Sequence, residues 1–353
     1  MSAGTAQVFV VLLADVGSRA VTEVLALCDI ASPSPRWRRH AQNLLTVRPH
    51  APSSDLQSRL EGHPAVARVI ALRGTRLFAH WPNGTPRAVG LGNGASFCGS
   101  SPVVIAGPCS VEGSQQVLEI AEAVAEAGAH ALRGGVFKPR TSPYDFAGLG
   151  EPGLHMLVQA SRRTGLPIVT EVLDAGCLDL LAQHADMLQI GSRNMHNPPL
   201  LFAVGAHPRG RPVLLKRGLG ATVDELLEAA EYVLLGRLAG GHAEPGLVLC
   251  ERGIRTFETS TRFTLDVAAL PVLARKTHLP VIVDPSHAAG ERGLVPALAA
   301  AGIAAGARGL IVEVHGEPEK AWCDGPQSLD FAAFRALMAA VNLSHNTGAA
   351  RGI

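Results

Sequence analysis

The sequence predicts an α/β protein that consists of a (β/α)8 TIM barrel and a small N-terminal ferredoxin-like α+β domain. From Pro102 onward, eight short apolar runs alternate with helical segments, and this alternation indicates a parallel sheet. The eight units span roughly 240 residues, close to the usual size of such a barrel. The first ~75 residues follow a different order of elements. A doubly wound open sheet is the alternative, but it seldom has eight strands without a glycine-rich nucleotide turn.

The composition excludes several classes of protein. The chain has 353 residues, of which 47% are hydrophobic and 17% charged, so its core is large enough to fold unaided. Its net charge of +1 lacks the basic excess of a nucleic-acid or membrane-surface protein. No apolar run reaches the ~18 residues of a membrane span, and no basic segment precedes Val8–Leu13 as a signal peptide would require. The six cysteines form no CxxC pair, which favours reduced thiols in the cytoplasm.

Residues 1–75 are expected to form the ferredoxin-like domain. Their order is β-α-β-α-β, one strand short of the ferredoxin-like pattern. The missing strand would fall in Ala31–His40, where Pro33 and Pro35 argue against a central strand. The basic run Arg36–His40 is either a ligand patch or, as is commoner for such runs, a solvated loop. The expected strands are Gln7–Leu13, Leu44–Val47 and Val66–Leu72, and the expected helices are Ser18–Cys28 and Ser53–Glu61.

Residues 76–101 are rich in Gly, Pro, Asn and Ser, which predicts a linker or a small hairpin. Their Gly-Leu-Gly-Asn-Gly segment at 90–94 superficially resembles a dinucleotide-binding loop. It lacks the full glycine spacing, and a strand follows it instead of the helix that such a loop requires. We interpret the segment as a turn.

The barrel is expected over residues 102–342, followed by a flexible polar tail at 343–353. Its strands are predicted at Val103–Ala106, Ala131–Leu132, Pro167–Val169, Met187–Ile190, Val213–Leu215, Leu247–Leu249, Val281–Val283 and Leu310–Val312. The predicted helices include Gln115–Ala127, Leu154–Thr164, Thr222–Leu238, Val267–Thr277 and Leu294–Ala305. Every strand is followed by a charged or metal-capable side chain. Because the C-terminal ends of barrel strands meet at one rim, these side chains predict a single site there.

Seven of these rim residues are cationic: Arg133, Lys138, Arg140, Arg193, Lys216, Arg217 and Arg252. Any one of them alone would more commonly form a surface salt bridge, but seven at strand ends need anions to offset their charge. Arginine forks match the geometry of phosphates and carboxylates, and lysine acts as a point charge. A substrate pair that carries two phosphates and one carboxylate would satisfy the set.

A second group at the rim offers metal ligands: Cys109, His287, Glu313 and Asp324. A thiolate, an imidazole and two carboxylates suit a divalent metal such as Mn²⁺, Fe²⁺, Co²⁺ or Zn²⁺. Structural zinc would instead favour four Cys or His ligands at close spacing. Cys323, beside Asp324, is ambiguous. The remaining cysteines are expected to be buried packing residues: Cys28, Cys98, Cys177 and Cys250.

These motifs resemble those of the 3-deoxy-D-arabino-heptulosonate 7-phosphate (DAHP) synthases, in the type I beta branch that also contains the 3-deoxy-D-manno-octulosonate 8-phosphate synthases. The matching segments, which cover the whole barrel in the family's order, are Ala-Gly-Pro-Cys-Ser-Val-Glu (106–112), Leu-Arg-Gly-Gly (132–135), Lys-Pro-Arg-Thr-Ser (138–142), Gln-Ile-Gly-Ser-Arg-Asn (189–194), Leu-Leu-Lys-Arg-Gly (214–218), Cys-Glu-Arg-Gly-Ile-Arg-Thr-Phe-Glu (250–258), Asp-Pro-Ser-His (284–287) and Ile-Val-Glu-Val-His (311–315). The octulosonate synthases carry an Ala-Asn-Arg-Ser-Ser type loop where this chain has Lys-Pro-Arg-Thr-Ser at 138–142. The loop of this chain therefore favours erythrose 4-phosphate.

The resemblance implies a role for each residue of the rim. The metal ligands would be Cys109, His287, Glu313 and Asp324. Phosphoenolpyruvate would be held by Arg133, Lys138, Arg193, Lys216 and Arg252, with Arg217 also counted among the substrate-binding cations. Erythrose 4-phosphate would be held by Arg140, Thr141 and Ser142, with Asp284 near its hydroxyls. The resemblance also implies a tetramer and an effect of Tyr or Phe through the N-terminal domain.

The implied reaction is an aldol-like condensation that begins the shikimate pathway to aromatic amino acids. The metal polarises the aldehyde, carbon 3 of phosphoenolpyruvate attacks it, and water adds at carbon 2 before phosphate leaves. The residues expected to be catalytic are Cys109, His287, Lys138 and Glu171, of which Glu171 positions or deprotonates the water, directly or through Lys138. One alternative is the octulosonate reaction with arabinose 5-phosphate. The other is a non-catalytic sensor of sugar phosphates or aromatic amino acids, which would not need a thiolate ligand.

Overall fold

The computed structural model describes residues 8–50, 55–72, 88–99, 101–242 and 244–349. The chain divides into two compact units, residues 1–80 and residues 81–353. The expected linker residues 76–87, and the predicted element ends at Gln7 and Ser53, lie outside the described ranges. Within those ranges, none of the helices combines the length and apolarity that a bilayer crossing needs.

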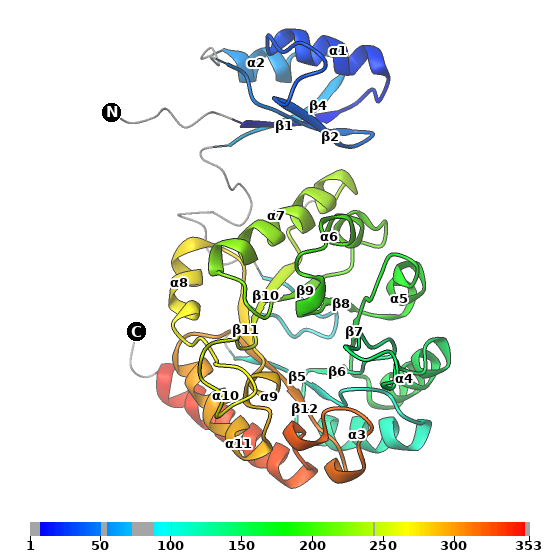
Figure 1. Cartoon of the computed structure of the whole chain (residues 1–353), viewed down its shortest axis with the longest axis vertical. Helices are drawn as coiled ribbons and strands as arrows, with labels where there is room; N and C mark the ends of the chain where they lie inside the picture. The colour runs from blue at the N-terminus through cyan, green and yellow to red at the C-terminus, as the bar shows by residue number, and fades with distance from the viewer. Residues whose placement is uncertain (1–7, 51–54, 73–87, 100, 243, 350–353) are drawn as a thin grey trace. The chain divides into compact units, whose positions relative to one another are not determined.

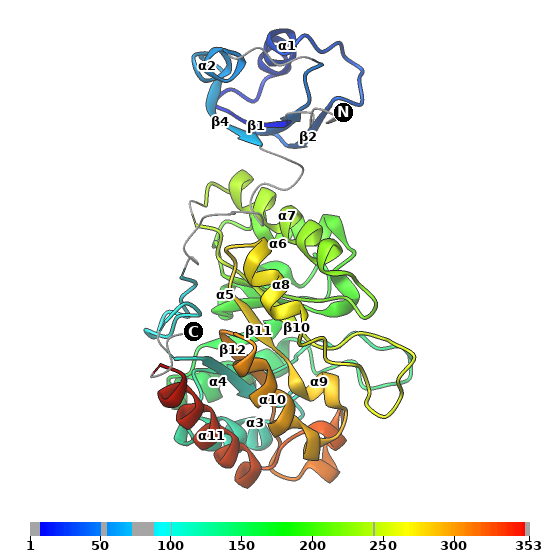
Figure 2. The ribbon, with the colours of Figure 1, turned by 90° about the vertical axis from the view of Figure 1, so that its left-hand side faces the viewer.

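The N-terminal unit is a four-stranded antiparallel sheet with two helices, in the order β-α-β-β-α-β. The elements are β1 (Val8–Leu13), α1 (Ser18–Leu27), β2 (Trp37–Ala41), β3 (Leu44–Val47), α2 (Leu56–Glu61) and β4 (Val66–Leu72). The sheet order is β2-β3-β1-β4, and both helices cover the same face of the sheet (Figure 2). This arrangement confirms the ferredoxin-like prediction.

The strand that could not be located from the sequence is β2, which forms the edge of this sheet and pairs with β3. The prolines of the preceding segment lie before the strand, and an edge position tolerates them nearby. Trp37 packs against the domain core, whereas Arg38 and Arg39 are exposed. The basic run at 36–40 is thus mostly a strand, and its interpretation as a solvated loop was wrong.

The second unit contains a closed barrel of eight parallel strands, as predicted. Its strands are β5 (Val103–Gly107), β6 (Ala131–Arg133), β7 (Ile168–Glu171), β8 (Met187–Ile190), β9 (Val213–Lys216), β10 (Leu247–Glu251), β11 (Val281–Val283) and β12 (Gly309–Glu313). Pairing of β12 with β5, from Gly309 opposite Val103 to Glu313 opposite Gly107, closes the ring. Every strand lies within two residues of its predicted bounds, because buried parallel strands are continuous apolar runs.

Helices surround the strands on the outside of the ring (Figure 1). They are α3 (Ser114–Glu126), α4 (Glu151–Thr164), α5 (Leu178–His184), α6 (Pro198–Ala206), α7 (Val223–Ala239), α8 (Ala269–Lys276), α9 (Pro285–Ala289), α10 (Val295–Ala304) and α11 (Phe331–Ala349), with short 3-10 turns η1 (Ser192–Asn194), η2 (Arg292–Leu294), η3 (Pro318–Lys320) and η4 (Gly325–Gln327). Helix α11 continues through most of the segment 343–353 that was expected to be a flexible tail. Residues 350–353 lie outside the described ranges.

A hairpin closes the N-terminal mouth of the barrel. Gly90 and Ser96 form an antiparallel bridge, which confirms the interpretation of segment 90–94 as a turn. Val89, Leu91 and Phe97 are at most 3% exposed and pack against the first residues of the barrel strands. The pocket described next lies at the opposite, C-terminal ends of the strands.

Candidate active site

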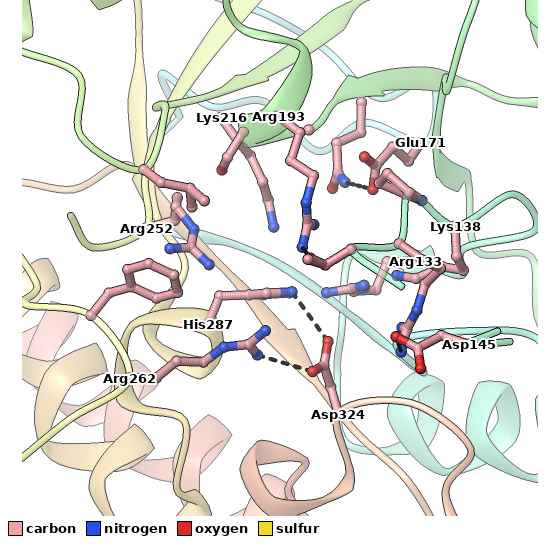
Figure 3. A pocket seen from close by; sticks show the side chains of 18 residues that line it. Arg133, Lys138, Asp145, Glu171, Arg193, Lys216, Arg252, Arg262, His287 and Asp324 are labelled. Carbon is pink, nitrogen blue, oxygen red and sulfur yellow. Dashed lines mark hydrogen bonds and ion pairs between the residues drawn. The ribbon is translucent and has the colours of Figure 1, made fainter. Parts of the chain in front are cut away.

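A polar pocket opens at the C-terminal end of the barrel (Figure 3). Its cationic lining residues are Arg133, Lys138, Arg140, Arg193, Lys216, Arg252 and Arg262. Three carboxylates line it as well: Asp145, Glu171 and Asp324. Seven cations against three carboxylates leave an excess of positive charge. The pocket is therefore suited to a ligand that carries several negative charges.

Four of these cations are buried, although burying a charge is costly unless it is paired. Arg133, Lys216 and Arg252 are 4%, 4% and 3% exposed, and Lys138 is 8% exposed. They come from the last residue of β6, the loop after it, the last residue of β9 and the residue after β10. Arg252 also stacks on Phe263, with its guanidinium carbon 4.1 Å from the ring centre. The strand ends thus aim fixed positive groups at one space.

Arg217 follows Lys216 directly but does not line the pocket. Its NH1 lies 2.7 Å from Glu251 Oε2 and 2.9 Å from Asp266 Oδ2, and its Nε donates to the carbonyl of Ala221 at 2.8 Å. Successive side chains at a strand end point to opposite sides. The structure therefore places Arg217 in a buried salt-bridge network. Its side chain does not line the pocket in which it was predicted to bind substrate.

The predicted metal ligands converge beside the pocket: His287 and Asp324 line it, and Cys109 and Glu313 lie against them. His287 Nε2 lies 3.4 Å from Glu313 Oε1 and 3.8 Å from Asp324 Oδ2. Cys109 Sγ lies 3.2 Å from the same oxygen of Asp324. Cys109 follows β5, His287 lies in α9, Glu313 ends β12 and Asp324 precedes η4. Closure of the barrel brings these four side chains together.

The side chains of His287, Glu313 and Asp324 each have a second polar atom that is not directed at the other donors. A different neighbouring residue contacts that atom in each of the three. Such anchoring fixes the orientation of a ligand before a metal binds. The anchors are Asp284 Oδ2 at 2.8 Å from His287 Nδ1, Gln327 Nε2 at 2.5 Å from Glu313 Oε2, and Arg262 NH1 at 2.9 Å from Asp324 Oδ1. Figure 3 shows the last contact, with Arg262 and His287 both directed at Asp324.

The chemistry of this donor set fits a divalent metal. Glu313 is fully buried, and its Oε1 has no hydrogen-bond partner, although Arg133 NH1 lies 3.1 Å away. Burial lowers the pKa of His287, which keeps the imidazole neutral as a ligand requires. In the described part of the chain, two groups of three potential donors share Asp324, and the ligand atoms of each group lie within 4.8 Å of one another. One group contains Cys109 and Cys323, the other His287 and Glu313. Sulfur, nitrogen and oxygen donors together suit a first-row transition metal.

A family comparison agrees with this geometry. The DAHP synthetase I family matches residues 90–346 of this sequence. The chain belongs to the DAHP synthetase I family. It is accordingly an enzyme, a transferase of this family.

Relatives and solved structures agree with the family assignment. The sequence is 51% identical over 235 residues to the phospho-2-dehydro-3-deoxyheptonate aldolase of Thermotoga maritima, a match that covers 67% of each chain. It is 33% identical over 253 residues to the 2-dehydro-3-deoxyphosphooctonate aldolase of Nitrobacter hamburgensis, covering 67% of this chain and 85% of that one. A solved DAHP synthase from Thermotoga maritima covers 97% of both chains, with a TM-score of 0.73 at 38% identity. A truncated form of the Thermotoga maritima enzyme covers 77% of this chain, with a TM-score of 0.69 at 42% identity.

The loop after β6 holds the residues expected to bind the aldose phosphate of the DAHP synthases. Arg140 and Thr141 line the pocket, and Thr141 Oγ1 lies 3.3 Å from Arg193 NH2. Ser142 does not line it, and its hydroxyl instead accepts the backbone N–H of Tyr144 at 3.3 Å. The structure thus brings two of the three loop residues to the pocket.

Asp284 lies beneath the pocket instead of lining it. Its carboxylate contacts Lys216 Nζ and His287 Nδ1, and its Oδ1 accepts the backbone N–H of His287. Burial would raise the pKa of this carboxyl, but His287 and Lys216 lower it well below its usual range. Asp284 therefore positions a cation and a predicted metal ligand, and it lies outside the pocket lining, where we expected it near the sugar hydroxyls.

Lys138 contacts both the pocket and one of the predicted metal ligands, Cys109. Its Nζ lies 3.1 Å from both Cys109 Sγ and the Cys109 carbonyl oxygen, while its side chain lines the pocket. Burial lowers the pKa of Lys138, but electrostatic attraction to the thiolates of Cys109 and Cys323 outweighs this and raises it above the usual range. Glu171 lines the pocket on the adjacent strand and accepts from Gln189 Nε2 at 3.2 Å.

The structure adds site residues that sequence reasoning missed. Arg262 and Phe263 come from the middle of the long loop after β10, which an antiparallel bridge between Ile254 and Thr264 folds back over the pocket. No strand end marks them in the sequence. Gln189 is different: it belongs to the matching segment 189–194 at the end of β8, and it lines the pocket although no role was predicted for it. Cys323 lies 3.1 Å from Cys109, inside the site.

Proposed function

We propose that this enzyme condenses phosphoenolpyruvate with erythrose 4-phosphate and water to give DAHP and phosphate, with a divalent metal as cofactor. The observation that carries the proposal is the meeting of two groups at one pocket. Seven cations line it, and the donors of Cys109, His287, Glu313 and Asp324 converge there, with His287 and Asp324 in its lining. The name of the 51% identical relative supports the same activity.

The cations supply the positioning that two anionic substrates require. Phosphoenolpyruvate carries a carboxylate and a phosphate, and we assign them to the buried set around Arg133, Lys216 and Arg252. Arg140 and Thr141, which come from the loop after β6, would hold the phosphate of the aldose. Holding two mutually repelling molecules in a reactive geometry lowers the barrier by several kcal/mol, up to roughly 7–11 kcal/mol in the best cases.

Cys109, His287, Glu313 and Asp324 would hold the metal, which supplies Lewis acidity to a carbonyl oxygen when bound. The site fits such an ion because three of the four ligand side chains are already anchored through a second atom. In the condensation, carbon 3 of phosphoenolpyruvate bonds to the aldehyde carbon, water adds at carbon 2, and the bond between carbon 2 and the phosphate oxygen then breaks. Atoms balance, since the water oxygen stays in DAHP and the phosphate leaves.

Glu171 and Lys138 are the candidate proton carriers of this step. Glu171 borders the pocket within one hydrogen bond of Gln189, which fixes its Oε2. Lys138 lies between the pocket and the Cys109 sulfur. We propose that Glu171 orients the attacking water, directly or through Lys138.

The test is an assay of phosphate release with purified protein. Erythrose 4-phosphate and arabinose 5-phosphate are supplied in parallel, each with phosphoenolpyruvate, with and without a chelator, and with Tyr or Phe added. We expect release with erythrose 4-phosphate, loss of it with chelator, and recovery on adding back a divalent metal. Preferred turnover of arabinose 5-phosphate would replace the aldose assignment, and turnover unaffected by chelator would remove the metal.

A further inference from the structure

Cys323 occupies a place in the site for which the predicted set of four metal ligands has no role. It lies in the segment between η3 and η4, next to Asp324, and is only 4% exposed. Its sulfur lies 3.1 Å from Cys109 Sγ, whose chain position is 214 residues away. Cys323, Cys109 and Asp324 form one of the two groups of potential metal donors in the described part of the chain.

The backbone explains how two successive side chains reach one place. Asp324 has φ +54°, in the left-handed region that residues other than Gly seldom adopt. The next residue, Gly325, is packed so tightly that a Cβ there would lie 2.2 Å from the carbonyl oxygen of Pro318. This turn directs Cys323 and Asp324 toward the Cys109 sulfur together, whereas consecutive residues in an extended strand would point to opposite sides.

Two cations lie beside the pair of sulfurs. Arg140 NH1 donates to Cys323 Sγ at 3.0 Å, and Lys138 Nζ lies 3.1 Å from Cys109 Sγ. Each sulfur of the pair therefore has a cation within hydrogen-bond distance. These two positive groups offset the negative charge that a pair of buried thiolate ligands would bring to the site.

We propose that Cys323 is a second thiolate ligand of the divalent metal, beside Cys109. This inference rests on the proposed metal site. On binding, the thiol of Cys323 gives its proton to solvent, and a sulfur lone pair forms the bond to the metal. Two thiolates make the site softer than one thiolate among imidazole and carboxylates. The enzyme should therefore select Zn²⁺, Co²⁺ or Cd²⁺ over Mn²⁺.

The experiment is a titration of the reduced, metal-free protein with Co²⁺, followed by absorption. Bonds between thiolate sulfur and Co²⁺ give charge-transfer bands in the near ultraviolet, whose intensity counts the thiolates. We compare the wild type with Cys323→Ser, Cys109→Ser and the double variant. Cys177→Ser is the matched control, because this thiol lies at the start of α5, outside the site. Circular dichroism confirms that each protein is folded.

We expect the band to fall by about half in Cys323→Ser, to persist at about half in Cys109→Ser, and to vanish in the double variant. The Cys177→Ser protein should match the wild type. A full band in Cys323→Ser together with none in Cys109→Ser would overturn the inference and leave the proposed metal site intact. Absence of Co²⁺ binding by the wild type would instead contradict the proposed metal dependence itself.

A second measurement remains decisive if a variant alters the geometry of Cys109 indirectly. The affinities of wild type and Cys323→Ala for Zn²⁺ and Mn²⁺ are determined by competition with a chromophoric chelator. Loss of a soft ligand should lower the Zn²⁺ affinity at least ~10-fold, the loss typical even of an outer-shell partner, and lower the Mn²⁺ affinity less. An equal fall for both ions would show that Cys323 acts only through its contact with Cys109.

Discussion

Lys216 and Arg217 are neighbours in the sequence, yet only Lys216 faces the pocket. Lys216 contacts the fully buried Asp284, and Arg217 contacts the fully buried Glu251. Both pairs are buried, so breaking either leaves a carboxylate without a counter-charge. The two cations differ in what they reach besides their partners: Lys216 lines the pocket, while Arg217 lies outside the pocket lining.

Replacing Arg217 should therefore cost stability more than substrate affinity. In Arg217→Met, Glu251 loses its cation in a buried site, and the free energy of unfolding should fall by about 3–5 kcal/mol. Urea denaturation measures this fall. Arg252→Met is the comparison, because it should raise the KM for phosphoenolpyruvate with a smaller change in unfolding free energy. The reverse pattern in the two variants would place Arg217 at the substrate.

Removing Lys138 should lower turnover and not only affinity. Lys138 contacts the Cys109 sulfur and lines the pocket, so Lys138→Ala removes the positive charge that we propose acts on the reacting groups. We expect kcat to fall on the order of 10²–10³-fold, the range seen when a well-placed stabilising donor is removed. Steady-state kinetics under saturating substrate measure kcat. Lys276→Ala, which removes an exposed lysine paired with Asp224, should leave kcat unchanged. An unaltered kcat in Lys138→Ala would rule out its catalytic role.

Two of the predicted metal ligands, Cys109 and His287, can be tested by a matched pair of variants. Cys109→Ala and His287→Ala each remove one donor from a site whose other donors are separately anchored, so the fold should persist. We expect both variants to lose metal-dependent turnover while their far-ultraviolet circular dichroism stays that of the wild type. Phosphate release in metal-supplemented and metal-free buffers measures this. Full activity of either variant in metal-free buffer would refute the metal assignment.

At the scale of elements, helices α6 and α7 approach each other closely because both carry glycine at the contact. A Cβ at Gly205 would lie 2.1 Å from the carbonyl oxygen of Val233, and one at Gly236 would lie 2.3 Å from that of Phe202. Such distances cannot be relieved by a side-chain rotation, since the obstructing atoms belong to the backbone. The two helices must separate if either glycine gains a side chain.

Gly205→Ala should therefore destabilise the barrel. The gain in helix propensity from Gly to Ala, about 1 kcal/mol, is smaller than the cost of forced separation, so we expect a net loss of about 1–3 kcal/mol. Chemical denaturation gives the value. Gly113→Ala is the control, because nothing lies within 4 Å of a Cβ there. A Gly205→Ala protein as stable as the wild type would show that the helices can move apart freely.

At the scale of the whole molecule, the hairpin before the barrel belongs to the second unit and seals its N-terminal mouth. Val89, Leu91 and Phe97 cover core residues such as Ile105 and Met187. Burying each such side chain contributes about 1.5–3 kcal/mol. The boundary between the two units therefore lies before this hairpin and not at the first barrel strand.

Two truncations test this division. A protein that starts at residue 88 keeps the hairpin and should fold and turn over like the full chain, with any effect of Tyr or Phe lost. A protein that starts at residue 101 exposes the barrel mouth and should lose several kcal/mol of stability. Thermal unfolding and binding of a hydrophobic dye distinguish the two proteins. Equal stability of both would mean that the hairpin adds nothing to the barrel core.

The sequence alone determined the barrel and the identity of its chemical rim. Apolar runs at barrel spacing mark strands that are buried on both faces, and parallel strands all present their C-terminal ends on the same side. A charged residue directly after such a run must therefore lie at the rim, as Arg133, Lys216 and Glu313 do. The fourth strand of the N-terminal domain could not be predicted from the sequence, because the edge strand β2 is half exposed and lacks an apolar run.

Only the tertiary structure decided which rim residues meet and which turn away. Arg217 points away from the pocket because successive side chains at the end of a strand point to opposite sides. Arg262 reaches the pocket because a long loop folds back over it. Cys323 meets Cys109 across 214 positions because β12 closes the ring against β5. Distances between residues far apart in the chain arise from that closure and from the packing of loops upon it, and no local pattern of residues encodes them.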